Sequence, residues 1–134
     1  MDQTSVPVLI VDDQAPFRTA ARAVVGVTPG FDVVGEAESG EQAVELADEL
    51  HPSVVLMDIN MPGIDGYEAT RRITDAHPET LVILVSTYAA NDLAADAHSC
   101  GAGAYVHKEE LAPRVLRDLW ASGGDPEWRR TAAS

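Results

Sequence analysis

Five short apolar segments recur along the chain, separated by longer stretches in which apolar residues return at helical spacing. The segments are VPVLIV (6–11), FDVVGEA (31–37), SVVLMD (53–58), LVILVS (81–86) and GAYVHK (103–108). The first, third and fourth are almost continuously apolar, which is typical of parallel strands that are covered on both faces. The pattern therefore predicts five strands, three of them fully buried.

The stretches between the strands carry apolar stripes with the spacing of amphipathic helices. Ser39, followed by Gln42, has the pattern of a capping box at the start of the second helix. The stripes consist of Phe17, Ala20, Ala21, Val24 and Val25; Ala43, Leu46, Ala47 and Leu50; Gly66, Ala69, Thr70 and Ile73; Ala90, Leu93, Ala94 and Ala97; and Leu111, Val115, Leu116 and Leu119. Strand and helix alternating five times predict a doubly wound α/β fold with right-handed crossovers.

The chain is long enough for one domain with a single hydrophobic core, at 134 residues. We expect that domain over residues 1–121. Over residues 122–134 the helical periodicity is lost, so we expect a flexible tail in which only Trp128 could dock onto the domain.

Charge and composition exclude several classes of partner. Acidic residues outnumber basic ones by 22 to 9, and a net charge of −13 repels phosphate backbones, so direct nucleic-acid binding is not expected. No apolar stretch approaches the roughly 20 residues that span a bilayer, and the first residues lack the pattern of a signal peptide. The single Cys100 fits a reducing compartment. We therefore expect a cytoplasmic protein without membrane contacts.

Polar residues stand where four of the five predicted strands end. Asp12 and Asp13 follow the first strand, and Asp58 closes the third. Ser86 ends the fourth strand and Lys108 the fifth. Because ligands of open α/β sheets bind at the carboxyl ends of the strands, we expect these side chains to share one cleft.

The chemistry of that set is specific. Three carboxylates in one place are costly unless a cation joins them, and hard oxygen ligands suit Mg²⁺ or Mn²⁺. The ammonium of Lys108 and the hydroxyl of Ser86 can bind an anion held against such a cation. A cation, an anion site and a further carboxylate together indicate phosphoryl transfer onto the carboxylate itself, which gives an acyl phosphate.

The sequence closely resembles the receiver domain of two-component response regulators, from about Val6 to Trp120. The resemblance rests on VLIVDDQ, VVLMDINMPGIDG, ILVST and GAGAYVHK, in that order and at similar spacing. It implies a flavodoxin-like (βα)5 fold with strand order 2-1-3-4-5. It also implies a signalling phosphoacceptor that catalyses its own phosphorylation and slow dephosphorylation, rather than an enzyme acting on other substrates.

The resemblance assigns roles to the acidic residues. Asp58 would accept the phosphoryl group from the phosphohistidine of a sensor histidine kinase or of a histidine phosphotransfer protein. Asp13 and Asp58 would bind Mg²⁺ through their carboxylates and Asn60 through its backbone carbonyl, whereas Asp12 would act mainly through water.

It also assigns the residues around the phosphoryl group. Lys108 would pair with the phosphoryl oxygens, and Ser86 would hydrogen-bond one of them. Tyr105 falls at the position of a switch aromatic that changes rotamer as Ser86 moves. The side chains of Asn60 and Tyr88 fall at positions that tune the lifetime of the phosphoryl group.

Two positions depart from the pattern of the family. Glu109 stands where a proline often follows the lysine, so the commonly cis Lys–Pro bond is absent. Thr87 stands where a small residue is usual, and with Tyr88 it could cover the phosphorylation pocket and slow turnover. Some receivers attached to DNA-binding domains share the absence of the proline, so the site itself is not in question.

We expect a stand-alone, single-domain response regulator. Output would be contact with an unknown protein target, through the face made by the expected fourth helix, fifth strand and fifth helix; homodimerisation on phosphorylation and onward phosphoryl transfer stay open. The alternative is a phosphorylation-independent binding module, although such degenerate receivers usually lack one of the site residues. A flavodoxin-like cofactor site is disfavoured because carboxylates would repel its phosphate. A haloacid-dehalogenase-like phosphatase is disfavoured because Asn60 stands where its second Asp would be.

Overall fold

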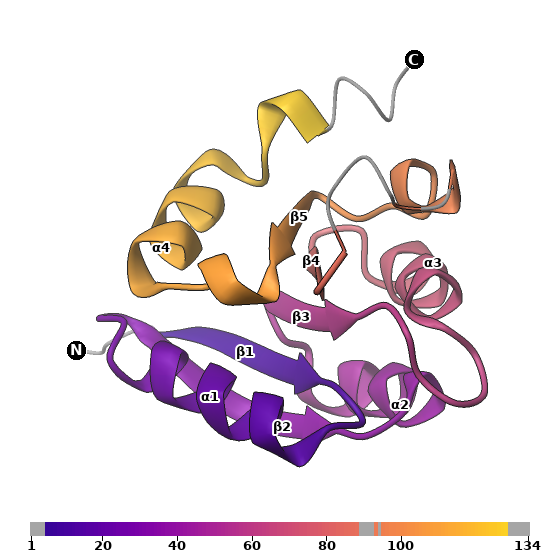
Figure 1. The fold of residues 1–134 in the computed structure, drawn as a ribbon, viewed down its shortest axis with the longest axis horizontal. Coiled ribbons are helices and arrows are strands. Elements are labelled where there is room, and N and C mark those ends of the chain that lie inside the picture. The colour runs from indigo at the N-terminus through magenta and orange to yellow at the C-terminus, as the bar shows by residue number, and fades with distance from the viewer. Residues whose placement is uncertain (1–4, 89–92, 94, 129–134) are drawn as a thin grey trace.

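The computed structural model describes residues 5–88, 93 and 95–128. Its core is a five-stranded parallel sheet in the order β2-β1-β3-β4-β5, which confirms the predicted doubly wound topology (Figure 1). The strands are β1 (Val6–Val11), β2 (Phe31–Ala37), β3 (Val54–Asp58), β4 (Leu81–Ser86) and β5 (Ala104–His107).

Helices lie on both faces of the sheet, because the chain first runs from β1 to the edge strand β2 and then in the opposite direction through β3, β4 and β5. The helices are α1 (Ala15–Gly26), α2 (Gly40–Leu50), α3 (Gly66–Ala76) and α4 (Pro113–Ser122), and two short 3₁₀ helices are η2 (Ala95–His98) and η3 (Lys108–Glu110). One apolar layer joins α2 and α3 to the sheet, and a second joins α1 and α4 to its other face. The strands β3 and β4 are buried throughout, which is why their sequences lack polar alternation.

The expected fourth helix falls in a part of the chain that is only partly described. Of its stripe, Ala90 and Ala94 lie outside the described residues. Of the two described residues of the stripe, Leu93 lies in a bend, and Ala97 is fully buried in the 3₁₀ helix Ala95–His98 instead of an α-helix. Gly101 follows it at φ 100°, a left-handed conformation that ends the turn before β5.

The segment after α4, which the sequence analysis expected to be flexible, is packed against the domain as far as Trp128. The chain leaves α4 at Gly123, whose left-handed φ of 69° ends the helix. The amide of Asp125 then donates to the carbonyl of Gly103 at 2.9 Å, and Trp128 is only 7% exposed. Residues 129–134 of the expected tail lie outside the described residues. Among the helices of the described part of the chain, none is long and apolar enough to cross a bilayer.

Candidate functional site

The register of the sheet brings the strand ends together. Asp58 ends β3 and is paired with Val85, the residue before Ser86 at the end of β4. Ser86 in turn is paired with His107, directly before Lys108. Asp12 directly follows Val11, whose partner is Met57. The carboxyl ends of four strands therefore meet at one edge, as parallel strands require.

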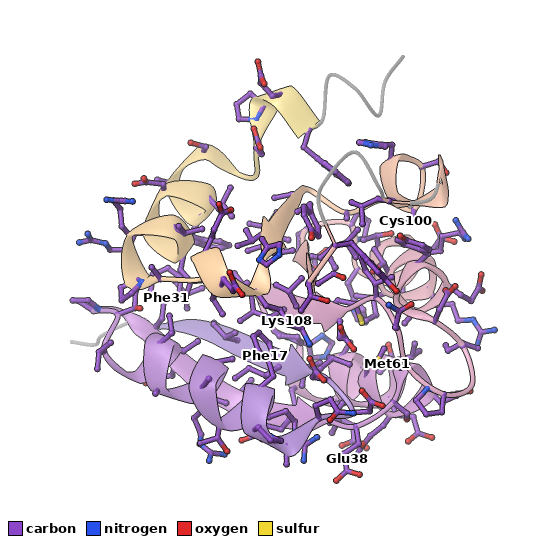
Figure 2. All side chains as sticks on the ribbon, in the orientation of Figure 1. Phe17, Phe31, Glu38, Met61, Cys100 and Lys108 are labelled. Carbon is purple, nitrogen blue, oxygen red and sulfur yellow. The ribbon has the colours of Figure 1, made fainter. Side chains whose placement is uncertain are left out.

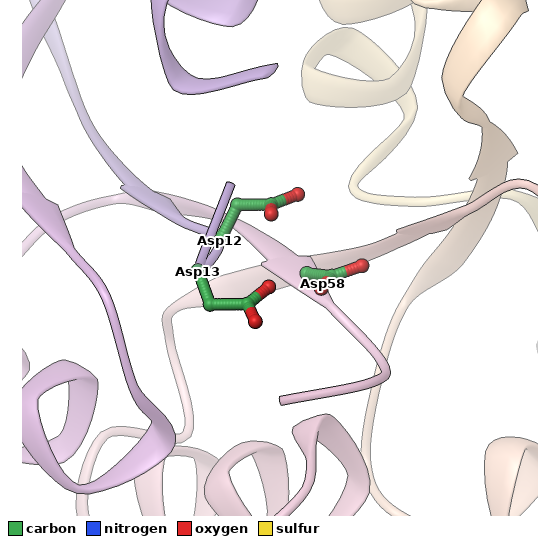
Figure 3. A group of neighbouring side chains, drawn as sticks. All are labelled: Asp12, Asp13 and Asp58. Carbon is green, nitrogen blue, oxygen red and sulfur yellow. The ribbon is translucent and has the colours of Figure 1, made fainter. Parts of the chain in front are cut away.

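Three carboxylates form the centre of this edge (Figure 3). One oxygen of each of Asp12, Asp13 and Asp58 lies within 4.8 Å of the others. Asp12 and Asp58 are buried residues, at 0% and 5% exposure, whereas Asp13 is partly open to solvent. A set of hard oxygen donors with one solvent-facing member suits a small divalent cation that keeps some of its water, as Mg²⁺ does.

A single ammonium group lies against this cluster. The Nζ of Lys108 is 2.6 Å from Oδ2 of Asp12 and 3.4 Å from Oδ1 of Asp58. It also lies 4.5 Å from the centre of the ring of Phe17, on α1, and the two side chains approach each other in Figure 2. Two carboxylates and one aromatic ring thus lie close to the ammonium, which limits where the flexible lysine can point.

Burial changes the ionisation of Asp58. Desolvation, reinforced by the negative charge of Asp12, raises the pKa of Asp58 to about 6, against an opposing effect of Lys108. For Lys108, burial alone would lower the pKa, but the hydrogen bond to Asp12 and the charge of Asp58 raise it, so the ammonium stays protonated. The site thus holds a fixed positive charge beside a carboxylate that is costly to ionise.

The backbone around Asp12 is fixed by its own neighbours. Its Oδ1 accepts a hydrogen bond from the amide of Gln14 at 2.8 Å, which forms a turn leading into α1. The guanidinium of Arg18, one turn into that helix, donates to the carbonyl of Asp12 at 2.7 Å. One carboxylate oxygen is therefore engaged locally, and the other faces Lys108.

Gly66, the first residue of α3, permits a close approach to Asp58. A Cβ at this position would lie 2.2 Å from the carbonyl oxygen of Asp58 and 2.9 Å from Cα of Ile59. The amide of Gly66 donates to the carbonyl of Ile59 at 2.9 Å. The start of α3 is thus packed directly on the backbone of Asp58, and only glycine fits there.

Two side chains of β5 hold the loop that follows Ser86. The hydroxyl of Tyr105 lies 3.3 Å from the carbonyl of Ser86 and also bonds the carbonyl of Tyr88. The Nε2 of His107 is 2.9 Å from the carbonyl of Thr87. Burial raises the pKa of Tyr105, so its hydroxyl remains a donor at neutral pH. The loop is therefore tied to β5 through three consecutive carbonyls.

Glu109, the departure from the proline pattern, takes part in this arrangement. The described residues contain no cis peptide bond. The amide of Glu109 donates to Nδ1 of His107 at 3.1 Å, which a proline could not do. Because Nδ1 accepts, the neutral ring carries its proton on Nε2, where it can donate to Thr87.

The structure places the predicted residues as follows. The three carboxylates of Asp12, Asp13 and Asp58 lie together, and Lys108 contacts the first and the third of them. Ser86 ends the neighbouring strand. Asn60, Thr87 and Tyr88 are exposed in loops at the same edge. Phe17 and His107 also lie at the site and were not among its predicted residues. Phe17 had been assigned to the apolar stripe of the first helix. Nothing in the sequence indicated that its ring would contact Lys108, 91 positions later in the chain.

Comparison with known protein families shows which family contains a chain with this site. The model of the response regulator receiver domain matches residues 8–119. The chain belongs to the response regulator receiver family. Members of this family are signalling phosphoacceptors that bind Mg²⁺ in an acidic pocket, and they interact with histidine kinases or phosphotransfer proteins.

Individual relatives agree. The transcriptional regulatory protein DegU of Brevibacillus brevis is 35% identical over 92% of this chain and 53% of its own length. The response regulator GacA of Pseudomonas viridiflava is 40% identical over 77% of this chain and 48% of its own length. The response regulator domain of Thermotoga maritima CheB superposes with a TM-score of 0.79 at 34% identity, covering 91% of this chain and 99% of that domain. The chain spans about half the length of the two curated relatives.

Proposed function

We propose that this receiver accepts a phosphoryl group on Asp58, from a phosphohistidine donor and in a Mg²⁺-dependent reaction in the cytoplasm. The observation that supports this best is the position of the Asp58 carboxylate. It is buried at the end of β3, beside two further carboxylates and 3.4 Å from a protonated lysine. A carboxylate in such a place is disfavoured as a free anion and stabilised by a cation, which suits a nucleophile that works only with its metal.

The chemistry follows from the arrangement of the side chains. A carboxylate oxygen of Asp58 forms the new bond to phosphorus, while the bond from phosphorus to the donor imidazole nitrogen breaks and the electron pair leaves with the imidazole. Lys108 neutralises the phosphoryl oxygens as they approach, and the hydroxyl of Ser86 donates a hydrogen bond to one of them. Lys108 needs only a short movement, because its Nζ already lies between Asp12 and Asp58.

The cation would be held by the acidic cluster. We assign the carboxylates of Asp13 and Asp58 and the backbone carbonyl of Asn60 as direct ligands, with Asp12 acting through water. When bound, Mg²⁺ supplies positive charge to the phosphoryl oxygens. Mn²⁺ has similar ligand preferences and serves as the comparison ion in the experiments below.

The consequence of phosphorylation would be a change in protein contacts. We propose that Tyr105 acts as the switch, because its hydroxyl is bonded to the loop that begins at Ser86. Asn60, Thr87 and Tyr88 would set how long the phosphoryl group survives, since they are exposed around the mouth of the site. A target protein would bind the face made by the expected fourth helix, of which η2 is described, together with β5 and α4; we call it the β5 face. The net charge of −13 disfavours direct contact of this chain with nucleic acid.

The second candidate is a binding module that needs no phosphorylation. The described site favours the phosphoacceptor, because the three carboxylates and the lysine expected of an active receiver are all present. The lysine also contacts two of the carboxylates. Intact-mass analysis after incubation with acetyl phosphate separates the two. The phosphoacceptor predicts one phosphoryl group per chain in Mg²⁺ and none in EDTA, with Mn²⁺ as the comparison ion. We expect Asp58→Asn to abolish the label. Asp32→Asn, which removes an exposed carboxylate of β2, is the control and should keep it. A wild-type chain that stays unlabelled in Mg²⁺, even with a histidine kinase as the phosphoryl donor, would support the binding module.

A further inference from the structure

The segment that follows α4 (Figure 1) is bonded to the residue before β5 and contains a buried aromatic side chain, Trp128. The Nε1 of Trp128 donates to the carbonyl of Ala102 at 3.2 Å. Its ring packs at a tilt against the ring of His98, with centroids 4.1 Å apart, and stacks on the ring of Tyr105, with centroids 6.1 Å apart at an interplanar angle of 28°. Trp128 thereby joins the apolar core on this face of the sheet.

The backbone of the same segment is also anchored. The amide of Gly124 donates to the carbonyl of Leu119 at 2.8 Å, and that of Asp125 to the carbonyl of Gly103 at 2.9 Å. Asp125 in turn accepts from the amide of Glu127 at 3.0 Å through its side chain. These bonds define a turn that returns the chain from α4 to the strand β5, so the docking of Trp128 is part of the fold.

The residue beneath Trp128 is connected to the phosphorylation site. Tyr105 stacks on Trp128 with its ring and bonds the carbonyls of Ser86 and Tyr88 with its hydroxyl. The hydroxyl of Ser86 also accepts from the amide of Tyr88 at 3.2 Å, so the loop moves with the side chain of Ser86. A continuous set of contacts therefore runs from the end of β4 through Tyr105 to Trp128.

We propose that residues 123–128 are an autoinhibitory latch, which covers the β5 face in the unphosphorylated protein and is released when Asp58 is phosphorylated. The inference rests on the proposed function of Asp58. Drawing the hydroxyl of Ser86 towards a phosphoryl group shifts the carbonyls of Ser86 and Tyr88 away from the hydroxyl of Tyr105. The ring of Tyr105 then moves away from the ring of Trp128, and the loss of this stacking contact weakens the docking of residues 123–128.

The latch has a thermodynamic consequence, because coupling between two sites is reciprocal. If docked Trp128 favours the unphosphorylated arrangement of the loop, its removal must favour the phosphorylated one. Beryllofluoride, a phosphoryl analogue that binds carboxylates, measures this without turnover. We expect Trp128→Ala to bind beryllofluoride with Mg²⁺ at least about five-fold more tightly than the wild type, the lower end of typical coupling.

Fluorescence tests the release directly. The chain has two tryptophans, and Trp120, exposed on α4, can be changed to Phe so that Trp128 is the only emitter. Acetyl phosphate and Mg²⁺ are added to Trp120→Phe, and each sample is divided between intact-mass analysis and acrylamide quenching. The latch predicts a red-shifted emission and an at least twofold larger quenching constant in the labelled protein, and no change in Trp120→Phe combined with Asp58→Asn.

The outcomes separate the two proposals. A chain that is labelled while the quenching of Trp128 stays constant overturns the latch and leaves the phosphoacceptor intact. A chain that is never labelled overturns both.

Calorimetric titration with beryllofluoride compares the affinities of the wild type, of Trp128→Ala and of Trp120→Ala, which is the matched control. Equal affinities of the wild type and Trp128→Ala contradict the latch. Because Trp128 is a core residue, Trp128→Phe, which loses only the bond to Ala102 and part of the ring, gives a second variant, for which a smaller tightening is expected.

Discussion

The raised pKa of Asp58, the proposed phosphoacceptor, predicts that its ionised carboxylate destabilises the folded protein. Burial and the charge of Asp12 raise its pKa from 3.8 to about 6. A group whose pKa is higher in the folded protein favours folding at low pH, and this contribution is lost as the pH rises through the folded pKa. Asp58→Asn removes the ionisation, so the variant should gain stability over the wild type between about pH 4 and pH 7.

The magnitude follows from the shift in pKa. At about 1.4 kcal/mol per unit, the rise from 3.8 to about 6 corresponds to about 3 kcal/mol at neutral pH. Solvent close to Asp13 screens part of this energy, so we expect a gain of about 1 to 3 kcal/mol at pH 7.5. At pH 4.5 the unfolded carboxyl is ionised but the folded one is still protonated, and about a third of that gain remains. Mg²⁺ supplies the missing counter-charge and should narrow the difference at pH 7.5.

Urea unfolding followed by circular dichroism measures the effect at both pH values, in EDTA and in Mg²⁺. Asp32→Asn is the matched control, because it makes the same chemical change at an exposed position on β2. A gain for Asp58→Asn that is equal at pH 4.5 and pH 7.5, or no larger than that of Asp32→Asn, would refute the argument that burial of the Asp58 charge is costly.

Four further substitutions test single contacts of the site. Lys108→Met leaves the buried Asp12 without its cation and should cost about 3 kcal/mol in EDTA, part of which Mg²⁺ restores; urea unfolding with and without Mg²⁺ measures this. Phe17→Leu removes the ring under Lys108 and should cost about 0.5 to 1 kcal/mol in the same assay, with slower labelling by acetyl phosphate. Gly66→Ala forces a Cβ against the carbonyl of Asp58 and should cost about 2 to 3 kcal/mol, whereas an unchanged unfolding midpoint contradicts the packing described. Thr87→Ala opens the mouth of the site and should shorten the half-life of the phosphorylated protein; an unchanged half-life removes Thr87 as a cover.

The sheet could be predicted from the sequence because its strands are short apolar runs with sharp ends. VVLMD ends at the carboxylate of Asp58 and LVILVS at the hydroxyl of Ser86, and the observed strands end at these same residues. Parallel pairing then makes the strand ends converge whatever the details of the helices. The acidic cluster was foreseeable for the same reason, since it depends on strand register alone.

Contacts between distant surfaces could not be predicted in this way. The stripe of Ala90, Leu93, Ala94 and Ala97 predicted an α-helix, but residues 95–98 form a 3₁₀ helix, a difference that periodicity cannot resolve over one turn. The packing of Trp128 depends on a turn that returns the chain to β5, through an amide at Asp125 that any residue except proline could supply. The contact of Phe17 with Lys108 likewise depends on how α1 sits on the sheet.

The central claim is that the phosphoryl group resides on Asp58, and site-resolved trapping tests it most directly. Borohydride reduces an acyl phosphate of aspartate to homoserine, which peptide mass spectrometry locates in the chain. After treatment with acetyl phosphate and Mg²⁺, the account predicts homoserine at position 58 and unchanged aspartate at Asp12 and Asp13. Homoserine at either of those two positions, or a labelled protein without homoserine at position 58, would contradict it.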